Sequence, residues 1–422
     1  MQPPTFNSAM KTTYAALLVF ALSCAAQAQT FTVLHTFNGK DGAGPVGQLA
    51  FDPDGNLYGT TTVGGSVACL GNGCGTAFRL NKKGTEFYSF DGGGGSDPFA
   101  GLTVVASRGA GYGTTYLGGD TSCYSYGCGT VYRLDSEGKE TVLHEFSGSP
   151  DGEEPQALLS VDAAGNLYGT TNGGGASSGY GTVFEVSAEG AETVLHSFAG
   201  PPEGGGDGAF PYEGVVRDSA GDLYGTTALG GAYGSGAVYK LDASSNETLL
   251  YSFSGGDGAN PGSLLLLDSQ GNLYGTTANG GNSQCGGAGC GVVFELSPQS
   301  GGGYTEKTLY IFCSLLECAD GEAPESGPLV IDGDRNLYGT TYFGGAYRNC
   351  DRDACGVVFQ LSPSGEETVL HSFTGGADGA GPVPGLTLDK AGSLYGTAAY
   401  GGDTDCDLGG APGCGVVFKI IP

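Results

Sequence analysis

The feature that most constrains this chain is a segment of about 56 residues that recurs seven times. In the clearest copy, Leu-Tyr-Gly-Thr-Thr at 167–171 precedes Gly-Thr-Val-Phe at 181–184 and Val-Leu-His-Ser-Phe at 194–198. The tyrosine of this segment recurs at Tyr58, Tyr112, Tyr168, Tyr224, Tyr274, Tyr338 and Tyr395. A period of this length, built only from strand-like segments and turns, predicts the blades of a β-propeller rather than independent domains.

Each repeat can be divided into four strands. A short apolar run, as at 263–267, follows the pattern Asp-Gly-x-x-Pro, and a turn of the type Asp-x-x-Gly-Asn, as at 162–166, leads into Leu-Tyr-Gly-Thr-Thr. Asp, Gly and Asn favour a tight hairpin at this turn. Gly-Val-Val-Phe is the third strand and Val-Leu-His-Ser-Phe the fourth. We expect the small residues of the second strand to let blades converge near the axis, and the bulky fourth strand to fill the rim.

The two ends of the chain supply complementary parts of one blade. Residues 33–37 are a fourth strand with no third strand before them, and residues 415–420 are a third strand with no fourth strand after them. Pairing the two segments closes a ring, whereas an open solenoid would need capping repeats. The sequence therefore predicts an all-β fold: a single seven-bladed β-propeller of four-stranded blades over residues 29–422, closed by pairing the N-terminal strand with the C-terminal hairpin.

The chain is rich in glycine, with 83 residues, and in tyrosine, with 23. This composition fits short strands joined by many tight turns. Because the glycines follow a repeat that also supplies apolar strands, a disordered low-complexity chain is excluded.

Residues 1–28 resemble an export signal peptide. Lys11 is their only charged residue, and a stretch of small apolar residues ends at a cleavage site after Ala28. The apolar stretch is short for a membrane span, so we expect a secreted protein, extracellular or periplasmic, without a span after cleavage. A cell-surface lipoprotein attached through Cys24 is the alternative, which fits less well because Leu22 stands two residues before the cysteine rather than three.

The formal net charge of −28 limits the possible partners. A field of this sign repels nucleic acid and anionic membrane surfaces, so both are excluded as partners. We expect a monomer that meets an unknown extracellular ligand.

The twelve cysteines that remain after signal cleavage fall into pairs of near neighbours. The pairs are Cys69/Cys74, Cys123/Cys128, Cys285/Cys290, Cys313/Cys318, Cys350/Cys355 and Cys406/Cys414. The two repeats with the shortest Gly-Gly loops, at 173–181 and 230–236, lack both partners there. This all-or-none pattern predicts six local disulfides, each stabilising by roughly 2 kcal/mol. A zinc site would need two pairs to meet in space, which pairs on separate blades do not favour.

The repeated blocks also resemble a known family. Gly-Asn-Leu-Tyr-Gly-Thr-Thr-x-x-Gly-Gly, Gly-Thr-Val-Phe and Glu-Thr-Val-Leu-His-Ser-Phe are similar to the Gloeo/Verruco (GloVer) tandem-repeat proteins, over essentially the whole mature chain. The resemblance implies a secreted bacterial repeat protein and brings no established activity with it.

The histidines do not form a catalytic constellation. All four, His35, His144, His196 and His371, occupy one slot of the fourth strand, and tyrosine replaces them in the other copies. A position that accepts either residue is typical of rim packing with a hydrogen-bonding tip. Without another histidine or an unpaired cysteine, no Ser-His-Asp or Cys-His centre can be assembled. We therefore assign no catalytic residue, no metal ligand and no cofactor.

Carboxylates are the candidate ligand-binding residues. The aspartate of Asp-Gly-x-x-Pro recurs at Asp41, Asp151, Asp207, Asp257, Asp320 and Asp378. We expect these loops on the same face as the disulfide-clipped cysteine loops, which would make it the binding face, with the aspartates around the axial mouth. Such a ring needs either capping by backbone N–H groups or a shared cation such as calcium. The turns at Asp52 and Asp332 resemble the start of a calcium loop only in part, and a plain hairpin is favoured there.

These observations favour a binding or scaffold protein of unknown ligand, either a glycan or another surface protein. Two alternatives stay open. One is a calcium-dependent propeller enzyme of the lactonase or glycan lyase type, with its site at the axial mouth. The other is a structural surface protein.

Overall fold

The computed structural model describes most of the chain after residue 28. The described residues are 29–66, 69, 72–105, 109–176, 179–200, 206–324, 327–347, 350, 355–383, 385–403, 405–406 and 412–422. The expected signal peptide at 1–28 and the alternative lipid attachment at Cys24 lie outside them. Within the described residues, no helix has the length and apolar character to cross a membrane.

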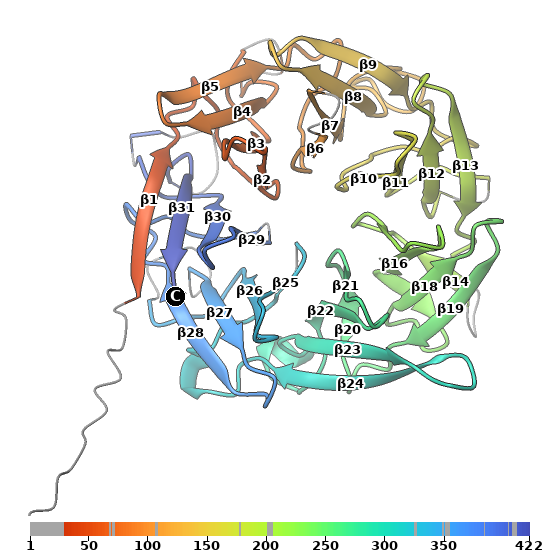
Figure 1. Ribbon diagram of the computed structural model, residues 1–422, viewed down its shortest axis with the longest axis vertical. Coiled ribbons are helices and arrows are strands. Elements are labelled where there is room, and N and C mark those ends of the chain that lie inside the picture. The colour runs from red at the N-terminus through yellow and green to blue at the C-terminus, as the bar shows by residue number, and fades with distance from the viewer. Residues whose placement is uncertain are drawn as a thin grey trace, which may run out of the picture.

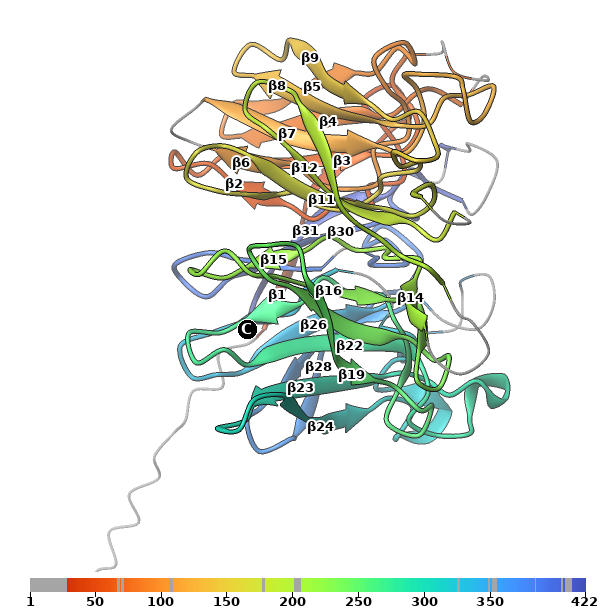
Figure 2. The same ribbon diagram turned by 90° about the vertical axis from the view of Figure 1, so that its right-hand side faces the viewer.

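Seven antiparallel sheets stand around a central axis as the blades of a propeller (Figure 1). In six blades the strands run from the axis to the rim in chain order, and in the seventh the first strand of the chain is outermost, which confirms the predicted all-β fold and its four-stranded blades. The C terminus lies on one side of the ring and strand β14 (Gly206–Ala209) on the other (Figure 2).

Each of the first four blades consists of four strands. Blade 1 contains β2 (Ala50–Phe51), β3 (Leu57–Thr61), β4 (Thr76–Asn81) and β5 (Gly84–Ser89). Blade 2 contains β6 (Thr103–Val105), β7 (Ala110–Thr115), β8 (Thr130–Asp135) and β9 (Glu140–Glu145). Blade 3 contains β10 (Ser160–Val161), β11 (Leu167–Thr171), β12 (Thr182–Val186) and β13 (Glu192–Ser197). Blade 4 contains β15 (Val216–Arg217), β16 (Leu223–Thr227), β18 (Ala237–Leu241) and β19 (Glu247–Ser252).

The remaining blades follow the same order, with small additions. Blade 5 contains β21 (Leu266–Leu267), β22 (Leu273–Asn279), β23 (Val292–Pro298) and β24 (Tyr304–Ile311). Blade 6 contains β25 (Val330–Ile331), β26 (Leu337–Thr341), β27 (Val357–Leu361) and β28 (Glu367–Ser372). Blade 7 contains β29 (Thr387–Leu388), β30 (Leu394–Ala398), β31 (Val416–Ile421) and β1 (Thr30–Thr36). In addition, β14 pairs with β17 (Leu229–Gly231), and β20 (Ala259–Pro261) pairs with β22.

The predicted hairpin between the first and second strands forms as expected. In blade 3, one carboxylate oxygen of Asp162 accepts the N–H groups of Gly165 and Asn166 at 2.7 and 2.9 Å. The other oxygen accepts the hydroxyl group of Tyr168 at 3.3 Å. The aspartate therefore closes the turn and also fixes the tyrosine of the second strand.

The glycine of Leu-Tyr-Gly-Thr-Thr has a different role from the one expected. A Cβ atom on Gly169 would lie 2.6 Å from Cζ of Phe184, in the third strand of the same blade. The glycine therefore makes room for an aromatic ring of its own blade, rather than for the neighbouring blade. The next residue does join blades, because the Thr170 hydroxyl donates to the carbonyl oxygen of Glu213 at 3.0 Å.

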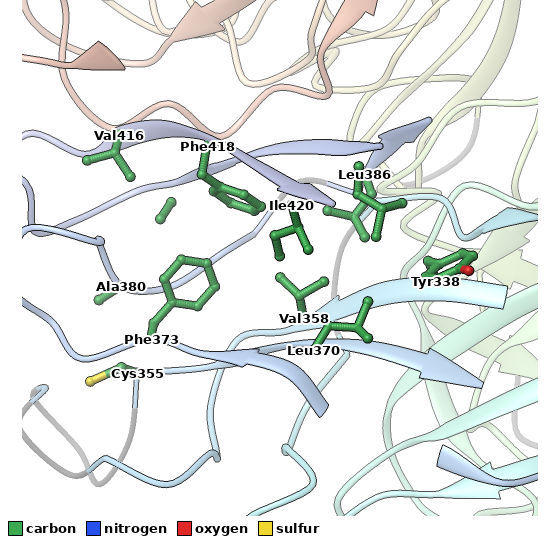
Figure 3. Close-up of a cluster of buried hydrophobic side chains, with 12 residues drawn as sticks. Tyr338, Cys355, Val358, Leu370, Phe373, Ala380, Leu386, Val416, Phe418 and Ile420 are labelled. Atoms are coloured by element: carbon green, nitrogen blue, oxygen red, sulfur yellow. The ribbon is translucent and has the colours of Figure 1, made fainter. Parts of the chain in front are cut away.

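The apolar core lies between blades. Seven buried clusters among the described residues each combine side chains of two adjacent blades. In the cluster between blades 6 and 7, Phe373 meets Phe418 edge to face, with ring centroids 5.3 Å apart (Figure 3). The same contact joins the other six neighbouring pairs of blades: Phe37–Phe78, Phe90–Tyr132, Phe146–Phe184, Phe198–Tyr239, Phe253–Phe294 and Phe312–Phe359.

The ring is closed as predicted. Strand β1 pairs with β31 in antiparallel register, from Thr30 opposite Ile421 to Thr36 opposite Val416. Beyond the strand, the Phe37 N–H donates to the Gly415 carbonyl oxygen at 3.0 Å. The N-terminal strand therefore supplies the outer edge of blade 7.

Because an aromatic contact between blades recurs around the ring, removing one should destabilise the whole domain. Phe198 is fully buried against Tyr239, with ring centroids 5.1 Å apart. We expect Phe198→Ala to lower the free energy of unfolding by about 3–5 kcal/mol, measured by denaturant unfolding. Phe87→Ala, at a side chain 51% exposed, is the control and should cost much less. Equal losses in the two variants would contradict the role of the contact between blades.

Ring closure can be tested by removing the N-terminal strand. A chain that lacks residues 30–38 would leave β31 as an exposed sheet edge and open the apolar surfaces beside it. We expect a sharp fall in melting temperature by calorimetry relative to a chain that begins at residue 29. An unchanged melting temperature would show that the pairing of β1 with β31 does not stabilise the ring.

Candidate functional site

The six candidate aspartates lie beside the outermost strand of their blades. In four blades, a histidine Nε2 contacts the aspartate at 3.0 to 3.2 Å; the pairs are His35–Asp41, His144–Asp151, His196–Asp207 and His371–Asp378. In the other two, a tyrosine hydroxyl donates instead; these pairs are Tyr251–Asp257 and Tyr310–Asp320. The histidine slot is therefore a hydrogen-bonding rim position, as predicted.

This placement corrects the expected one, because these aspartates do not converge on the axial mouth. They contact the fourth strand, which is farthest from the axis, and each stands in a separate blade. The chain crosses from rim to axis only after the aspartate, so the turn that contains it stays with the outer strand.

Each of the six carboxylates is capped within its own loop. The backbone N–H donors come from Asn38, Ser147, Ala199, Ser254, Ser314 and Thr374. Burial by itself would raise the pKa of Asp41, but hydrogen bonds from His35 and the Asn38 N–H hold that pKa below its ordinary value. Local capping thus accounts for these charges without a shared cation, and calcium binding by them stays a prediction.

The aspartates of the hairpin turns between the first and second strands are also hydrogen-bonded within their own turns. Asp52 accepts the N–H groups of Asp54 and Asn56 at 2.9 Å and the hydroxyl group of Tyr58 at 3.1 Å. Asp332 has the corresponding contacts in blade 6. Both turns are hairpins whose carboxylates are directed into the turn.

One rim group also has the composition of a metal site. His144, Asp151 and Glu192 can each place one ligand atom within 4.8 Å of the others. Burial, together with the charge of Asp151, raises the pKa of Glu192 to about 7. The glutamate can therefore carry a proton near neutral pH, which offsets the repulsion between the two carboxyl groups.

The six predicted disulfides are present, each between neighbouring cysteines. They are Cys69–Cys74, Cys123–Cys128, Cys285–Cys290, Cys313–Cys318, Cys350–Cys355 and Cys406–Cys414. This confirms the partner of every cysteine after the expected signal peptide.

Several cysteines of these loops are buried between blades rather than exposed on the loop face. Cys355 and Cys414 are each only 1% exposed. Cys355 belongs to the apolar cluster between blades 6 and 7 (Figure 3), and Cys414 to the cluster between blades 7 and 1. Cys74, Cys128 and Cys290 are fully buried in the same way. Each of these cysteines stands two residues before the third strand, whose start is packed between blades. It therefore fastens its loop to the core, where a ligand cannot reach it.

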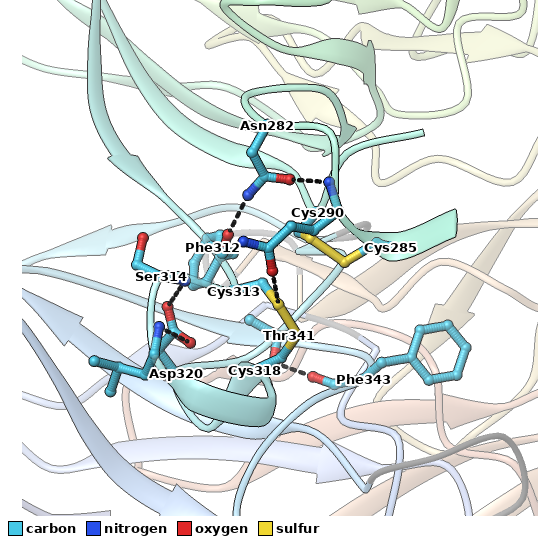
Figure 4. The surroundings of a disulfide bond; sticks show 12 residues. Asn282, Cys285, Cys290, Phe312, Cys313, Ser314, Cys318, Asp320, Thr341 and Phe343 are labelled. Carbon is cyan, nitrogen blue, oxygen red and sulfur yellow. Dashed lines mark hydrogen bonds between the residues drawn. A yellow bond between two sulfur atoms is a disulfide. The ribbon is translucent and has the colours of Figure 1, made fainter. Parts of the chain in front are cut away.

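The expectation that the cysteine pairs stay apart is wrong for blade 5. There the Cys285–Cys290 and Cys313–Cys318 disulfides lie in adjacent loops, with all four sulfur atoms within 4.8 Å of one another (Figure 4).

A cavity on the axis of the ring is a candidate ligand site. Its volume is about 530 Å³, and its lining includes the residue that directly follows the proline of Asp-Gly-x-x-Pro in five repeats and the residue after the equivalent Pro98 in blade 2. These residues are Val46, Phe99, Gln156, Tyr212, Gly262 and Val383. The corresponding residue of blade 6 lies outside the described part of the chain. A cavity shared by this many blades can only surround the axis.

Glu213 is the distinctive residue of this cavity. It occupies the second position after the proline, where other repeats have small residues: Gly47, Ala100, Ala157 and Ser263. Glu213 also lines a smaller axial cavity of about 40 Å³. Burial raises the pKa of its carboxyl group to about 8, although a hydrogen bond from the Gly327 N–H opposes this shift. Burial thus favours the uncharged form of this carboxyl group, which can both donate and accept hydrogen bonds.

Aromatic and amide groups complete the cavity wall. Phe99 and Tyr212 are 40% and 42% exposed, which is high for aromatic side chains next to a propeller core. Asn260 is held by its own contacts, since its amide donates to the Ala228 carbonyl oxygen at 3.0 Å and accepts from Asn279 at 3.1 Å. The cavity thus offers apolar ring faces beside a few oriented polar groups, a combination typical of small-molecule sites.

Sequence reasoning from motifs missed this cavity. The signal that could have found it is variation among the repeats: the position after the proline differs in almost every copy, while the surrounding motif recurs. Residues that pack between blades must be alike, whereas those that meet at the axis need not be.

Comparison with solved structures finds similar chains at low sequence identity. A catalytically inactive virginiamycin B lyase from Staphylococcus aureus, solved with quinupristin, has 12% identity and a TM-score of 0.55, covering 93% of this chain and 99% of the lyase. The periplasmic gluconolactonase PpgL from Pseudomonas aeruginosa has 16% identity and a TM-score of 0.47, covering 82% and 95%. At such identities the lyase shows the fold alone. A search of the curated proteins finds no match.

A family model extends over most of the blades. The model of the Gloeobacter/Verrucomicrobia repeat matches residues 72–288 and 286–422. These matches cover the same repeated blocks that build the ring, from the third strand of blade 1 onward. The chain therefore belongs to the Gloeobacter/Verrucomicrobia repeat family.

Proposed function

We propose that this protein is an exported, monomeric binding protein that holds a small uncharged ligand, such as a glycan end, in the axial cavity. The observation that carries this proposal is the lining of the cavity: Phe99 and Tyr212 stand beside the amide of Gln156 and the protonated carboxyl group of Glu213. The six disulfides support export, because such bridges persist in oxidising compartments.

The lining matches the chemistry of a sugar. A sugar ring has an apolar face, which packs on an aromatic ring, and hydroxyl groups, which need both donors and acceptors. Tyr212 and Phe99 supply the ring faces, while Gln156 and neutral Glu213 supply both kinds of hydrogen-bonding group. A cavity of about 530 Å³ has room for one or two sugar rings.

Charge disfavours anionic ligands. The chain has a net charge of −28, and none of the described residues that line the axial cavity is basic. An anionic ligand would therefore enter a repelling field without a counter-charge to meet it. We expect neutral ligands to be preferred over uronic or sialic acids.

An enzyme is the second candidate, and Glu213 is the observation that favours it. A carboxyl group whose pKa lies near the working pH can act as a general acid. The described residues provide no second carboxyl group in the cavity, whereas acid–base chemistry on glycosidic bonds uses a pair of carboxyl groups. We favour binding because the aromatic and amide groups of the lining suit the recognition of a sugar.

The proposal can be tested on a glycan array with the mature chain. We expect neutral glycans to bind, and Tyr212→Ala to weaken binding to the best of them at least about tenfold, or roughly 1.4 kcal/mol, by titration calorimetry. The reason is that this variant removes one aromatic face of the cavity while the loop backbone stays in place.

The matched control is Tyr233→Ala, at a tyrosine that is 68% exposed and does not line the cavity. It should bind as the unaltered protein does. Absence of glycan binding, or equal losses in the two variants, would contradict the axial site and favour a structural surface role. Turnover of a bound glycan that is lost in Glu213→Gln, with binding retained, would establish the enzyme instead.

Burial of Glu213 also predicts a pH dependence of stability. The folded chain holds this proton up to about pH 8, whereas the ordinary pKa of 4.5 applies after unfolding. Between these values the folded chain binds more protons than the unfolded chain, so the free energy of unfolding falls as pH rises. Glu213→Gln cannot ionise and should therefore lose less stability between about pH 5 and about pH 8.

Urea unfolding at the two pH values measures this difference. Glu189→Gln, at an exposed glutamate in a turn, is the control and should follow the unaltered protein. If Glu213→Gln shows the same fall as the control, the Glu213 carboxyl group is not held in its neutral form.

A further inference from the structure

The two disulfides of blade 5 form a four-sulfur cluster away from the axial cavity. Cys285–Cys290 lies in the loop between β22 and β23, and Cys313–Cys318 follows β24. Their sulfur atoms all lie within 4.8 Å of one another (Figure 4). Cys290 and Cys313 are buried, at 0% and 4% exposure. In the described part of the chain, no other two cysteine pairs meet in this way.

The repeat itself explains why these pairs meet. In blade 2, a Cβ atom on Gly148, in the loop after the fourth strand, would lie 3.7 Å from Cys123 Sγ. In blade 1, a Cβ atom on Gly92 would lie 2.8 Å from Cys69 Sγ. The loop after the fourth strand thus packs against the cysteine loop of its own blade. Blade 5 carries a second cysteine pair in this contacting loop.

The cluster has the composition and spacing of a structural zinc site. Both pairs have four residues between their cysteines, within the spacing found in zinc sites with four cysteine ligands. Zinc holds four sulfur atoms at about 2.3 Å, which places them roughly 3.8 Å apart in a tetrahedron. On zinc binding the two sulfur atoms of each bridge would separate, and the two pairs would draw slightly together.

The surroundings hold both loops in place. Asp320, which is fully buried, accepts the N–H groups of Ser314 and Leu315 at 2.8 and 3.2 Å and so fixes the loop of Cys313. The Gln284 amide lies 3.1 Å from Cys313 Sγ, and turning this amide by 180° presents an NH₂ donor to a thiolate. Donors of this kind orient and stabilise metal-bound sulfur.

We propose that Cys285, Cys290, Cys313 and Cys318 bind one zinc ion in tetrahedral geometry when both of their disulfides are reduced. Reduction by a dithiol gives two thiols per disulfide, and the dithiol becomes a disulfide. Zinc then replaces four thiol protons, which are released to solvent. Oxidation by a disulfide-class oxidant removes two electrons per pair, restores both bridges and frees the ion. Zinc occupancy and the disulfide form therefore exclude each other.

Cobalt titration of the reduced mature chain tests the site. A phosphine reduces the bridges without binding the metal: it takes the oxygen of one water per disulfide and becomes a phosphine oxide. Reduced protein should take up one Co²⁺ with the absorption bands of tetrahedral cobalt thiolate, which Zn²⁺ then displaces. The paired variant Cys313→Ser with Cys318→Ser should lose these bands. Its matched control, Cys123→Ser with Cys128→Ser, removes a pair with no second pair beside it and should keep them.

Alkylation with iodoacetamide, mapped on peptides, provides a second readout within a single protein. Zn²⁺ should slow modification of the four clustered cysteines at least tenfold, but not that of Cys69 and Cys74. This comparison stays informative if reduction loosens the fold, because both groups of cysteines experience the same loosening. Equal protection of all pairs, no protection, or the same cobalt bands in both paired variants would overturn the proposal.

Discussion

The ring depends on one contact repeated at each of its seven blade interfaces. A phenylalanine at the end of each outer strand meets the third-strand aromatic ring of the next blade edge to face, with centroids 5.0 to 5.3 Å apart. Because the ring is closed, no interface can change its spacing without straining the others. The second-strand glycine follows from this contact, since a Cβ atom at Gly169 would collide with the ring of Phe184. Burial between blades, rather than within them, makes the seven copies one domain.

Local hydrogen bonds stabilise the charged aspartates at the rim of the ring. The aspartates of Asp-Gly-x-x-Pro accept backbone N–H groups in their own loops and a histidine or tyrosine of the outer strand, as Asp41 does with Asn38 and His35. Local hydrogen bonds thus stabilise these carboxylates within their own loops. None of these aspartates is among the described residues that line the axial cavity.

The two candidate sites lie where individual repeats differ from the common sequence pattern. At the axis, Tyr212, Phe99 and Glu213 stand where other copies have smaller side chains. In blade 5, a second cysteine pair stands in the loop that touches the first. In both places individual repeats depart from the common pattern, while the aromatic contacts between blades recur around the ring. The repeat thus provides a scaffold, and its exceptions provide the candidate sites.

The sequence by itself determined the strands, their order, the ring closure and the disulfide partners, because each depends on local patterns or on contacts repeated in every copy. Only the tertiary structure decided what meets across the ring and what is buried there. It placed Asp41 and its equivalents at the rim, since the chain reaches the axis only after the proline, and it buried Cys355 and Cys414 between blades. It also brought Glu213 into the axial cavity and the Cys313 pair against the Cys285 pair, because neither contact is encoded in the spacing of a single repeat. Periodicity determines what is the same in each blade, while the candidate sites are formed by residues that differ between blades.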